Sequence, residues 1–273
     1  MSEQDYVLGT HEAEVERLGV QHRVWRDRVL ECWRRAGIRS GHKVVDVGCG
    51  PGYASLDLAQ IVGERGSVLG LERSDRFLAV ARERAAANRL GNIEVKRVDL
   101  VTDEWQVTDA DATWCRWVLA FVANPKVVLR KIAAALKPGG RAVFHEYFDY
   151  ASWRLAPRSA EFEEFVATVM RNWREAGGEP DIGLEVPAML EAAGLRVITC
   201  DPVVYAVRPS DPMWQWPASF VRVHLVHLAE TGRVAAAWAR AVQDAFDRTA
   251  RTPGAFLMTP AVLEIVAERT SGP

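Results

Sequence analysis

The sequence predicts an α/β fold in which a mostly parallel, doubly wound sheet of seven strands has helices on both faces. Short apolar stretches alternate with segments of helical periodicity between residues 43 and 147. A glycine-rich turn follows the first of these stretches in "VVDVGCGPGYASLDLA", and a further apolar stretch, "AVLEIVAER", lies near the C-terminus. Strands and helices that alternate at this spacing form βαβ units with right-handed crossovers.

The expected elements follow in chain order. A first helix occupies residues 10–36, where apolar positions recur at helical spacing, and Gly37 ends it. Ser74 is the expected N-cap of the third helix and Gly91 its terminator. Strands are expected over 43–48, 67–72, 93–100, 110–117 and 141–147, with helices over 53–63, 74–91 and 125–140.

The later part of the sequence has a different organisation. Residues 159–177 are expected to be helical, and residues 184–209 to form a helix followed by an extended pair. The aromatic-rich segment of about residues 211–250 is mostly helical in pattern and precedes the last strand. Such an insertion would form a lid over the carboxyl edge of the sheet, where doubly wound folds bind ligands. The expected organisation is one domain, with an N-terminal helical cap (1–40), a ligand-binding core (41–150) and the remaining sheet with its lid (151–273).

Composition narrows the class of partner. The 273 residues are 49% hydrophobic and 26% charged, with a net charge of −2 that gives no electrostatic footprint for nucleic acid. The four cysteines contain no Cys-x-x-Cys pair and indicate free thiols in a reducing compartment. No leader pattern or membrane-length apolar run is visible, so a soluble cytoplasmic protein is expected. A homodimer is left open.

The glycine-rich turn does not match the two common phosphate-binding patterns. A dinucleotide fingerprint needs a third small residue where this sequence has Tyr53, and its glycines follow the pattern Gly48-x-Gly50-x-Gly52. No Gly-Lys-Ser/Thr follows, which excludes a P-loop. The turn therefore indicates a ligand without a phosphate bridge.

Three carboxylates indicate what that ligand is. Asp46 stands two positions before the first glycine, where its negative charge would weaken the binding of a pyrophosphate and strengthen the binding of a cationic ligand. Glu72 closes the second strand, where a carboxylate accepts ribose hydroxyls, although a solvated residue at a helix entry is the alternative. Asp99 follows the third strand and can accept an adenine amino group or cap the next turn. Together they suit a nucleoside with a cationic tail.

At this point the sequence resembles the class I (Rossmann-like) S-adenosylmethionine-dependent methyltransferases that act on small molecules. The resemblance rests on "VVDVGCGPG", "GLERS", "RVDL" and "LKPGGRAVFHEY", in that order, and covers residues 5–150. It implies S-adenosylmethionine as cofactor, with S-adenosylhomocysteine as product. The cofactor-binding residues that it implies are Tyr6, Arg17, Gln21, Asp46, Gly48, Cys49, Gly50, Gly52, Glu72, Arg73, Asp99, Leu100, Cys115, Arg116 and Trp117.

Within that set, Glu72 would hold the ribose, while Asp99 and Leu100 would border the adenine. Asp46, the glycines and residues 115–117 would surround the methionine end. Tyr6, Arg17 and Gln21 would approach its carboxylate, with an ordinary surface position as the alternative for the last two.

Methyl transfer demands positioning and a dry site, and needs a base only for an acceptor that must lose a proton. His145 and Glu146 at the end of the fifth strand are the candidate bases, although a structural histidine is equally compatible with the pattern. The sequence "WCRW" lacks the Asn/Asp-Pro-Pro-aromatic motif, and Arg116 occupies a place where acidic ligands would be expected in metal-dependent relatives. No metal is expected.

Aromatic residues indicate the acceptor. The candidate acceptor-binding residues are Tyr147, Tyr150, Trp214, Trp216, Phe220 and His224, with core packing as the alternative for those in the lid. We therefore expect methyl transfer, on O or C, to a small apolar aromatic molecule of secondary metabolism or quinone type. Protein methylation and non-catalytic cofactor binding by a regulatory protein are the alternatives.

Overall fold

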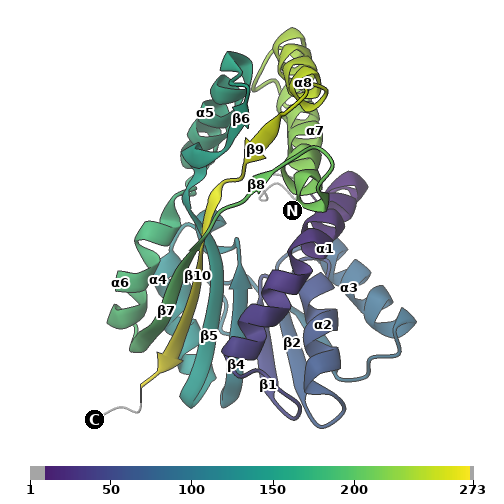
Figure 1. The fold of residues 1–273 in the computed structure, drawn as a ribbon. Coiled ribbons are helices and arrows are strands. Elements are labelled where there is room, and N and C mark those ends of the chain that lie inside the picture. The colour runs from purple at the N-terminus through teal and green to yellow at the C-terminus, as the bar shows by residue number, and fades with distance from the viewer. Residues whose placement is uncertain (1–9, 271–273) are drawn as a thin grey trace.

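The computed structural model describes residues 10–270. Its centre is a seven-stranded sheet with the strand order β3-β2-β1-β4-β5-β10-β7 (Figure 1). Strand β10 pairs antiparallel with both β5 and β7, whereas the pairs among the first five strands are parallel. The strands are β1 (Lys43–Val47), β2 (Ser67–Glu72), β3 (Ile93–Arg97), β4 (Ala110–Arg116), β5 (Leu136–Asp149), β7 (Leu195–Val203) and β10 (Ala261–Arg269).

Helices cover both faces of this sheet, which confirms the predicted fold class. One face carries α1 (Glu12–Arg35), α2 (Tyr53–Val62) and α3 (Asp75–Ala87), and the other carries α4 (Pro125–Ala135) and α6 (Val186–Ala192) (Figure 1). Local sequence explains their starts. The Ser74 hydroxyl accepts a hydrogen bond from Phe77 N at 3.3 Å, as expected of an N-cap, and Asn124 caps α4 in the same way.

A second layer lies above the carboxyl edge of the sheet (Figure 1). It contains α5 (Ala160–Glu175), α7 (Gln215–Glu230) and α8 (Ala236–Ala250). A small antiparallel sheet in the order β6-β9-β8 joins β6 (Arg154–Ala156), β9 (Phe256–Met258) and β8 (Ala206–Val207). Helix α1 rises past the sheet and packs against α7. Four 3₁₀ turns complete the described chain: η1 (Leu119–Phe121), η2 (Tyr150–Ser152), η3 (Ile182–Leu184) and η4 (Pro212–Trp214).

Some predicted boundaries were wrong. The third helix ends at Ala87 rather than at Gly91, because Asn88 caps it and Arg89 takes a left-handed conformation (φ 54°). Helix α4 ends at Ala135, and the Pro-Gly-Gly segment belongs to the start of β5, whose first residue pairs with β4. The helical segment 211–250 is divided by a turn containing Gly232 (φ 69°).

The core explains much of the tryptophan content. Trp25, Trp33, Trp114 and Trp153 are fully buried. Trp33 and Trp114 meet edge to face with ring centroids 5.3 Å apart, which fixes α1 against the middle of the sheet. Among the described helices, none combines the length and apolarity that a bilayer crossing requires.

Candidate active site

A cavity of about 810 Å³ opens at the carboxyl edge of the sheet, next to the point between β1 and β4 where the strand order reverses. Most of the predicted site residues line it: Arg17, Gln21, Asp46, Gly48, Cys49, Gly50, Glu72, Arg73, Asp99, Leu100, Arg116, Trp117, Tyr147, Tyr150 and Phe220. The structure places Gly52, Cys115, His145, Glu146, Trp214, Trp216 and His224 outside this wall. Tyr6 lies outside the described residues.

The three glycines of the turn have positive φ angles, and Gly50 differs from the other two in its surroundings. A Cβ on Gly48 would lie 2.5 Å from a methyl carbon of Val118, and one on Gly52 would lie 2.9 Å from Cβ of Ala81. These two glycines therefore permit close packing as well as the turn. A Cβ on Gly50 would meet nothing within 4 Å. Gly50 instead leaves open space on the cavity wall, where a ligand can approach the backbone.

Tyr53 occupies the position at which a dinucleotide site needs a small residue. Its hydroxyl donates a hydrogen bond to the carbonyl oxygen of Val15 in α1, at 3.1 Å. A Cβ on Gly19 would lie 2.4 Å from that hydroxyl, so α1 approaches Tyr53 closely because Gly19 has no side chain. The guanidinium of Arg84 lies 3.8 Å from the centre of the tyrosine ring. Tyr53 thus attaches α1 to the glycine turn.

Asp46, at the end of β1, is a buried carboxylate on the cavity wall. Its Oδ2 accepts a hydrogen bond from the Ser55 hydroxyl at 2.6 Å. Burial raises the pKa of Asp46 to about 6, although the Ser55 hydrogen bond and the Arg116 charge act to lower it. The carboxyl group is therefore mostly ionised at neutral pH, and a cation bound beside it would stabilise the ionised form.

Glu72 faces the glycine turn from the end of β2. Its carboxylate accepts hydrogen bonds from the backbone N–H groups of Gly50 (3.1 Å), Arg73 (2.9 Å) and Ser74 (2.9 Å). Burial raises the pKa of Glu72, and these three donors oppose that rise. Because a carboxylate offers about four acceptor positions, room remains for a ligand hydroxyl. The side chain is held in the cavity wall and is not a solvated residue at a helix entry.

Asp99 caps a turn and also lies on the cavity wall. Its Oδ1 accepts hydrogen bonds from the backbone N–H groups of Val101 (2.9 Å) and Thr102 (3.0 Å), so it caps the turn after β3. It also lines the cavity together with Leu100. Burial favours a higher pKa for Asp99, but the two N–H donors hold the pKa below its ordinary value. Asp99 is therefore an ionised acceptor at neutral pH.

Arg17 and Gln21 are buried components of the wall and not surface residues. The Arg17 guanidinium donates to both carboxylate oxygens of Glu14 (2.6 and 2.7 Å) and to Gln21 Oε1 (2.9 Å). Gln21 Oε1 also accepts a hydrogen bond from Trp216 Nε1 in α7 at 3.2 Å. This chain of contacts fastens the cap helix to the lid at the edge of the cavity.

A second part of the cavity wall consists of aromatic side chains. Tyr147 stacks on Trp117 at 5.4 Å, and Phe121 stacks on Trp173 at 4.3 Å. Phe121 and Trp173 are wall residues that the sequence analysis did not identify. Trp173 lies on the buried face of α5, so in the sequence it looks like any core residue of a helix. It is recognised as a wall residue only once α5 is placed above the sheet edge.

The remaining lid candidates support the wall from behind. Trp216 stacks on Trp117 at 5.4 Å, and His224 stacks on Phe220 at 4.8 Å. Burial lowers the pKa of His224 to about 3, so this imidazole is neutral. Trp214 packs against Phe246 of α8. The predicted placement of Trp214, Trp216 and His224 in the cavity was wrong, and the core-packing alternative describes these three residues.

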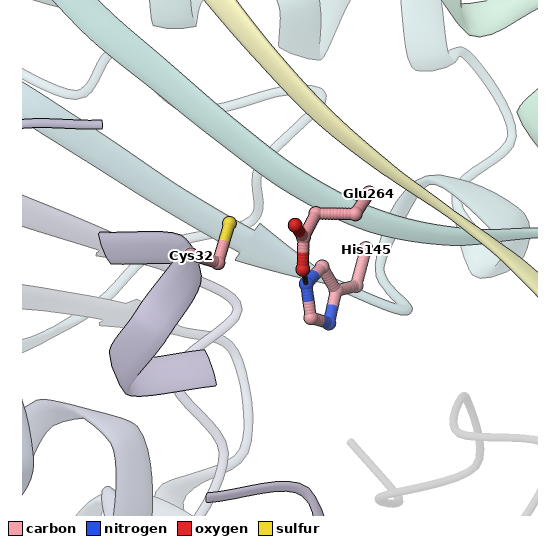
Figure 2. Close-up of side chains that lie close together, drawn as sticks. All are labelled: Cys32, His145 and Glu264. Atoms are coloured by element: carbon pink, nitrogen blue, oxygen red, sulfur yellow. Dashed lines mark hydrogen bonds and ion pairs between the residues drawn. The ribbon is translucent and has the colours of Figure 1, made fainter. Parts of the chain in front are cut away.

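His145 does not line the cavity, so its position does not support a role as catalytic base. Its side chain is fully buried beneath α1, and Nε2 lies 2.9 Å from a carboxylate oxygen of Glu264 in β10. Figure 2 shows His145 and Glu264 directed at each other, with Cys32 of α1 beside them. Burial lowers the pKa of His145 well below its ordinary value. The imidazole is therefore neutral and donates to Glu264.

This cluster has metal-ligating residue types but a charge pattern that disfavours a cation. The ligand atoms of Cys32, His145 and Glu264 lie within 4.8 Å of one another. Glu264 is also bound by the guanidinium groups of Arg28 and Arg35. These contacts use the acceptor positions of the carboxylate and bring two positive charges to the site. The cluster therefore attaches α1 to β10 and β5.

Glu146 points to the opposite side of β5 from His145, as strand alternation requires. Its Oε1 accepts hydrogen bonds from the backbone N–H groups of Val118 and Leu119, both at 2.9 Å. Burial raises its pKa to about 8. Glu146 thus supports the turn that carries Trp117 and Phe121 into the wall. It does not itself reach the cavity.

The family follows from a comparison with known proteins. Residues 38–193 match a family described as a methyltransferase domain, which is more than half of the chain. The chain therefore belongs to this family as a class I methyltransferase. Family membership together with the residues on the cavity wall supports S-adenosylmethionine as the cofactor. The resemblance stated from the motifs is confirmed.

Individual relatives are more distant. The chain is 32% identical to demethylmenaquinone methyltransferase of Shouchella clausii (strain KSM-K16) over 45% of this chain and 51% of that protein. The chain thus spans about half the length of the curated relatives it matches. Two solved structures share the fold. The [4+2]-cyclase SpnF has a TM-score of 0.59 at 23% identity, over 90% of this chain and 81% of its own. Geranyl diphosphate C-methyltransferase from Streptomyces coelicolor A3(2) has a TM-score of 0.59 at 17% identity, over 91% and 77%.

Proposed function

We propose that this protein transfers a methyl group to a small, largely apolar aromatic molecule. The observation that carries the proposal is the composition of one continuous cavity. One part of its wall offers carboxylates and a glycine turn, which suit a nucleoside with a cationic tail. The other part offers aromatic faces from β5, α5, α7 and the turn after β4. A donor and an aromatic acceptor can therefore be held next to each other.

The residues of the first part fit S-adenosylmethionine. We assign the ribose hydroxyls to Glu72, the adenine amino group to Asp99, and the cationic end to Asp46. Gly50 provides the open approach to the backbone. When bound, the cofactor supplies a methyl group on a positively charged sulfur.

The acceptor part of the wall works by position and by exclusion of water. Trp117, Tyr147, Tyr150 and Trp173 are each more than nine-tenths buried, and flat rings of this kind hold planar apolar molecules. Among the described wall residues there is no histidine, and the carboxylates belong to the cofactor part. We therefore favour an acceptor oxygen or carbon that is already nucleophilic. A relative named demethylmenaquinone methyltransferase is consistent with a ring-shaped acceptor.

Two other functions remain compatible with the family, and two features of the cavity argue against them. A protein substrate would need an open groove, whereas Arg17, Gln21 and Phe220 bring α1 and α7 over the cavity. A non-catalytic cofactor-binding protein would need no acceptor space, whereas the aromatic part of the wall borders open volume. Both features support a small-molecule methyltransferase.

The test is an incubation of the purified protein with methyl-labelled S-adenosylmethionine and a panel of phenols, indoles and quinones, followed by mass spectrometry. We expect label to appear in at least one aromatic compound. The same label in peptides of a protein mixture, with none in the panel, would instead indicate protein methylation. Cofactor binding without any transfer would favour the non-catalytic alternative.

The assignment of Asp46 predicts a pH dependence of cofactor binding. The pKa of Asp46 in the free protein is about 6, and a bound cation lowers it because the cation stabilises the ionised carboxylate. Affinity for S-adenosylmethionine should therefore fall as the pH drops below about 6. In Asp46→Asn the affinity should be lower at neutral pH and should lose this dependence. Calorimetric titrations on both sides of pH 6 measure it, and an identical pH dependence in the variant would remove Asp46 from the site.

A further inference from the structure

One buried cation on the cavity wall has an unused donor. Arg116 ends β4, and its Nη1 has no hydrogen-bond partner among residues 10–270, although that atom is buried. The guanidinium lies 5.1 Å from the ring centre of Trp117 and 5.7 Å from that of Trp114. Burial lowers its pKa to about 10, so it keeps its charge at neutral pH. Burying a cationic donor without a hydrogen-bond partner costs free energy unless a ligand accepts a hydrogen bond from it.

The same guanidinium is oriented by a chain of two further side chains. Arg116 Nη2 lies 3.2 Å from His22 Nδ1 in α1, and His22 Nε2 lies 3.1 Å from Asp57 Oδ2 in α2. Because arginine can only donate, His22 Nδ1 must accept, and the imidazole proton must be on Nε2, where it donates to Asp57. This tautomer is neutral. Burial has the largest effect on the pKa of His22 and lowers it, so the imidazole stays neutral.

The charged groups around His22 are arranged as this neutral tautomer requires. Asp57 faces Nε2 from α2, Arg116 faces Nδ1 from β4, and Arg26 of α1 donates to both oxygens of Asp57 (2.8 and 3.2 Å). On its other side, the imidazole is stacked on Tyr53, with ring centroids 5.9 Å apart. Asp57 fixes the imidazole, and the imidazole fixes the guanidinium, so Nη2 of Arg116 is tethered while Nη1 has no partner among the described residues.

From this geometry we propose that Arg116 binds an oxyanion in the cavity and that His22 and Asp57 are its positioning residues. The inference rests on the proposed function and makes it more specific. Two oxyanions have the right chemistry: the carboxylate at the methionine end of the cofactor and an ionised oxygen on an aromatic acceptor. Either one would complete Nη1 with a charge-assisted hydrogen bond. In the second case Arg116 stabilises the acceptor in its nucleophilic, ionised form.

Three ligands distinguish these sources in the full-length protein. S-Adenosylhomocysteine contains the carboxylate, 5′-methylthioadenosine lacks it, and 4-nitrophenol ionises to a coloured phenolate. If Arg116 binds the cofactor, Arg116→Gln should weaken S-adenosylhomocysteine binding by about tenfold or more and leave 5′-methylthioadenosine within about twofold. If it binds the acceptor, binding of both nucleosides should persist, and phenolate binding to the S-adenosylhomocysteine complex should weaken by a similar factor.

The controls separate positioning from folding. Arg26→Gln removes a guanidinium that also binds Asp57 but does not line the cavity, so ligand affinities should change by less than about twofold. His22→Phe keeps a ring on Tyr53 but removes the acceptor, and should reproduce part of the Arg116→Gln loss. His22→Asn restores an acceptor oxygen and should recover much of it. Thermal unfolding of each variant identifies any that misfold, and Arg116→Met, which fills similar space without charge or donor, then replaces Arg116→Gln with the same expected losses.

Unchanged affinity of Arg116→Gln for all three ligands would overturn the inference. Equal effects of His22→Phe and His22→Asn would overturn the positioning role of His22 alone. Failure of the unmodified protein to bind S-adenosylhomocysteine would count against the proposed function instead, so the two failures are distinguishable.

Discussion

Replacing Glu72 with alanine is expected to weaken S-adenosylmethionine binding by about 1–3 kcal/mol, which corresponds to roughly 5- to 150-fold in affinity. The carboxylate is placed to accept the ribose hydroxyls, and it also holds the backbone N–H groups of Gly50, Arg73 and Ser74. Its loss therefore removes a ligand contact and loosens the turn on which the ligand lies. Isothermal titration calorimetry with the cofactor measures the effect.

Two variants separate these contributions. Glu72→Gln keeps an acceptor for the backbone donors, so it should preserve the turn and lose only the charge-assisted part of ribose binding. Asp75→Ala removes a neighbouring carboxylate that also lines the cavity but is largely exposed, and its effect should be small. An affinity of Glu72→Ala equal to that of the unmodified protein would exclude Glu72 from the ribose site.

Replacing Glu264 with glutamine should lower the free energy of unfolding by about 2–3 kcal/mol, measured by chemical denaturation at neutral pH. Removing one partner of a buried ion pair costs about 3–5 kcal/mol when the remaining charge stays buried. Arg28 and Arg35 are each about one-third exposed and can return to water, which reduces that cost. His145 is fully buried and loses its carboxylate acceptor.

Glu268 provides the matched control on the same strand. It also binds two arginines, Arg141 and Arg196, but its side chain is 22% exposed. Glu268→Gln should therefore cost no more than about 1 kcal/mol. Equal destabilisation by the two substitutions would show that burial of Glu264 and its contact with His145 contribute nothing specific.

The central sheet and the cofactor part of the cavity could be predicted because local patterns determine them. Apolar stretches of strand length separated by helical periodicity define βαβ units, and these units bring the ends of β1, β2 and β3 to one edge. Asp46, Glu72 and Asp99 each stand at such an end, so their shared location followed from the topology. The bordering glycine turn followed for the same reason.

The role of His145 could not be predicted from the same patterns. Alternation along β5 separates His145 from Glu146, but it does not say which face meets the cavity. The structure shows that neither does, because His145 faces α1 and Glu264, while Glu146 supports the turn after β4. Glu264 is 119 positions away in sequence, and its pairing depends on β10 lying next to β5.

The small sheet of the second layer was predicted only in part, for a related reason. Strand β8 lies within the extended pair predicted in residues 184–209, whereas β6 and β9 have three residues each, which is too short for any alternation to be visible. They pair only because the chain returns to the same place after long helical segments. Phe121 and Trp173 were missed in the same way, because each looks like a core residue until the lid is in place.

The roles proposed for Asp46, Glu72 and Asp99 require that the cavity receives a nucleoside with a positively charged sulfur and no phosphate bridge. Calorimetric titration of the purified protein with S-adenosylmethionine and, separately, with nicotinamide adenine dinucleotide tests this most directly. We expect saturable binding of the sulfonium nucleoside to one site per chain and no measurable heat from the dinucleotide. Saturable binding of the dinucleotide, with none of S-adenosylmethionine, would contradict the account.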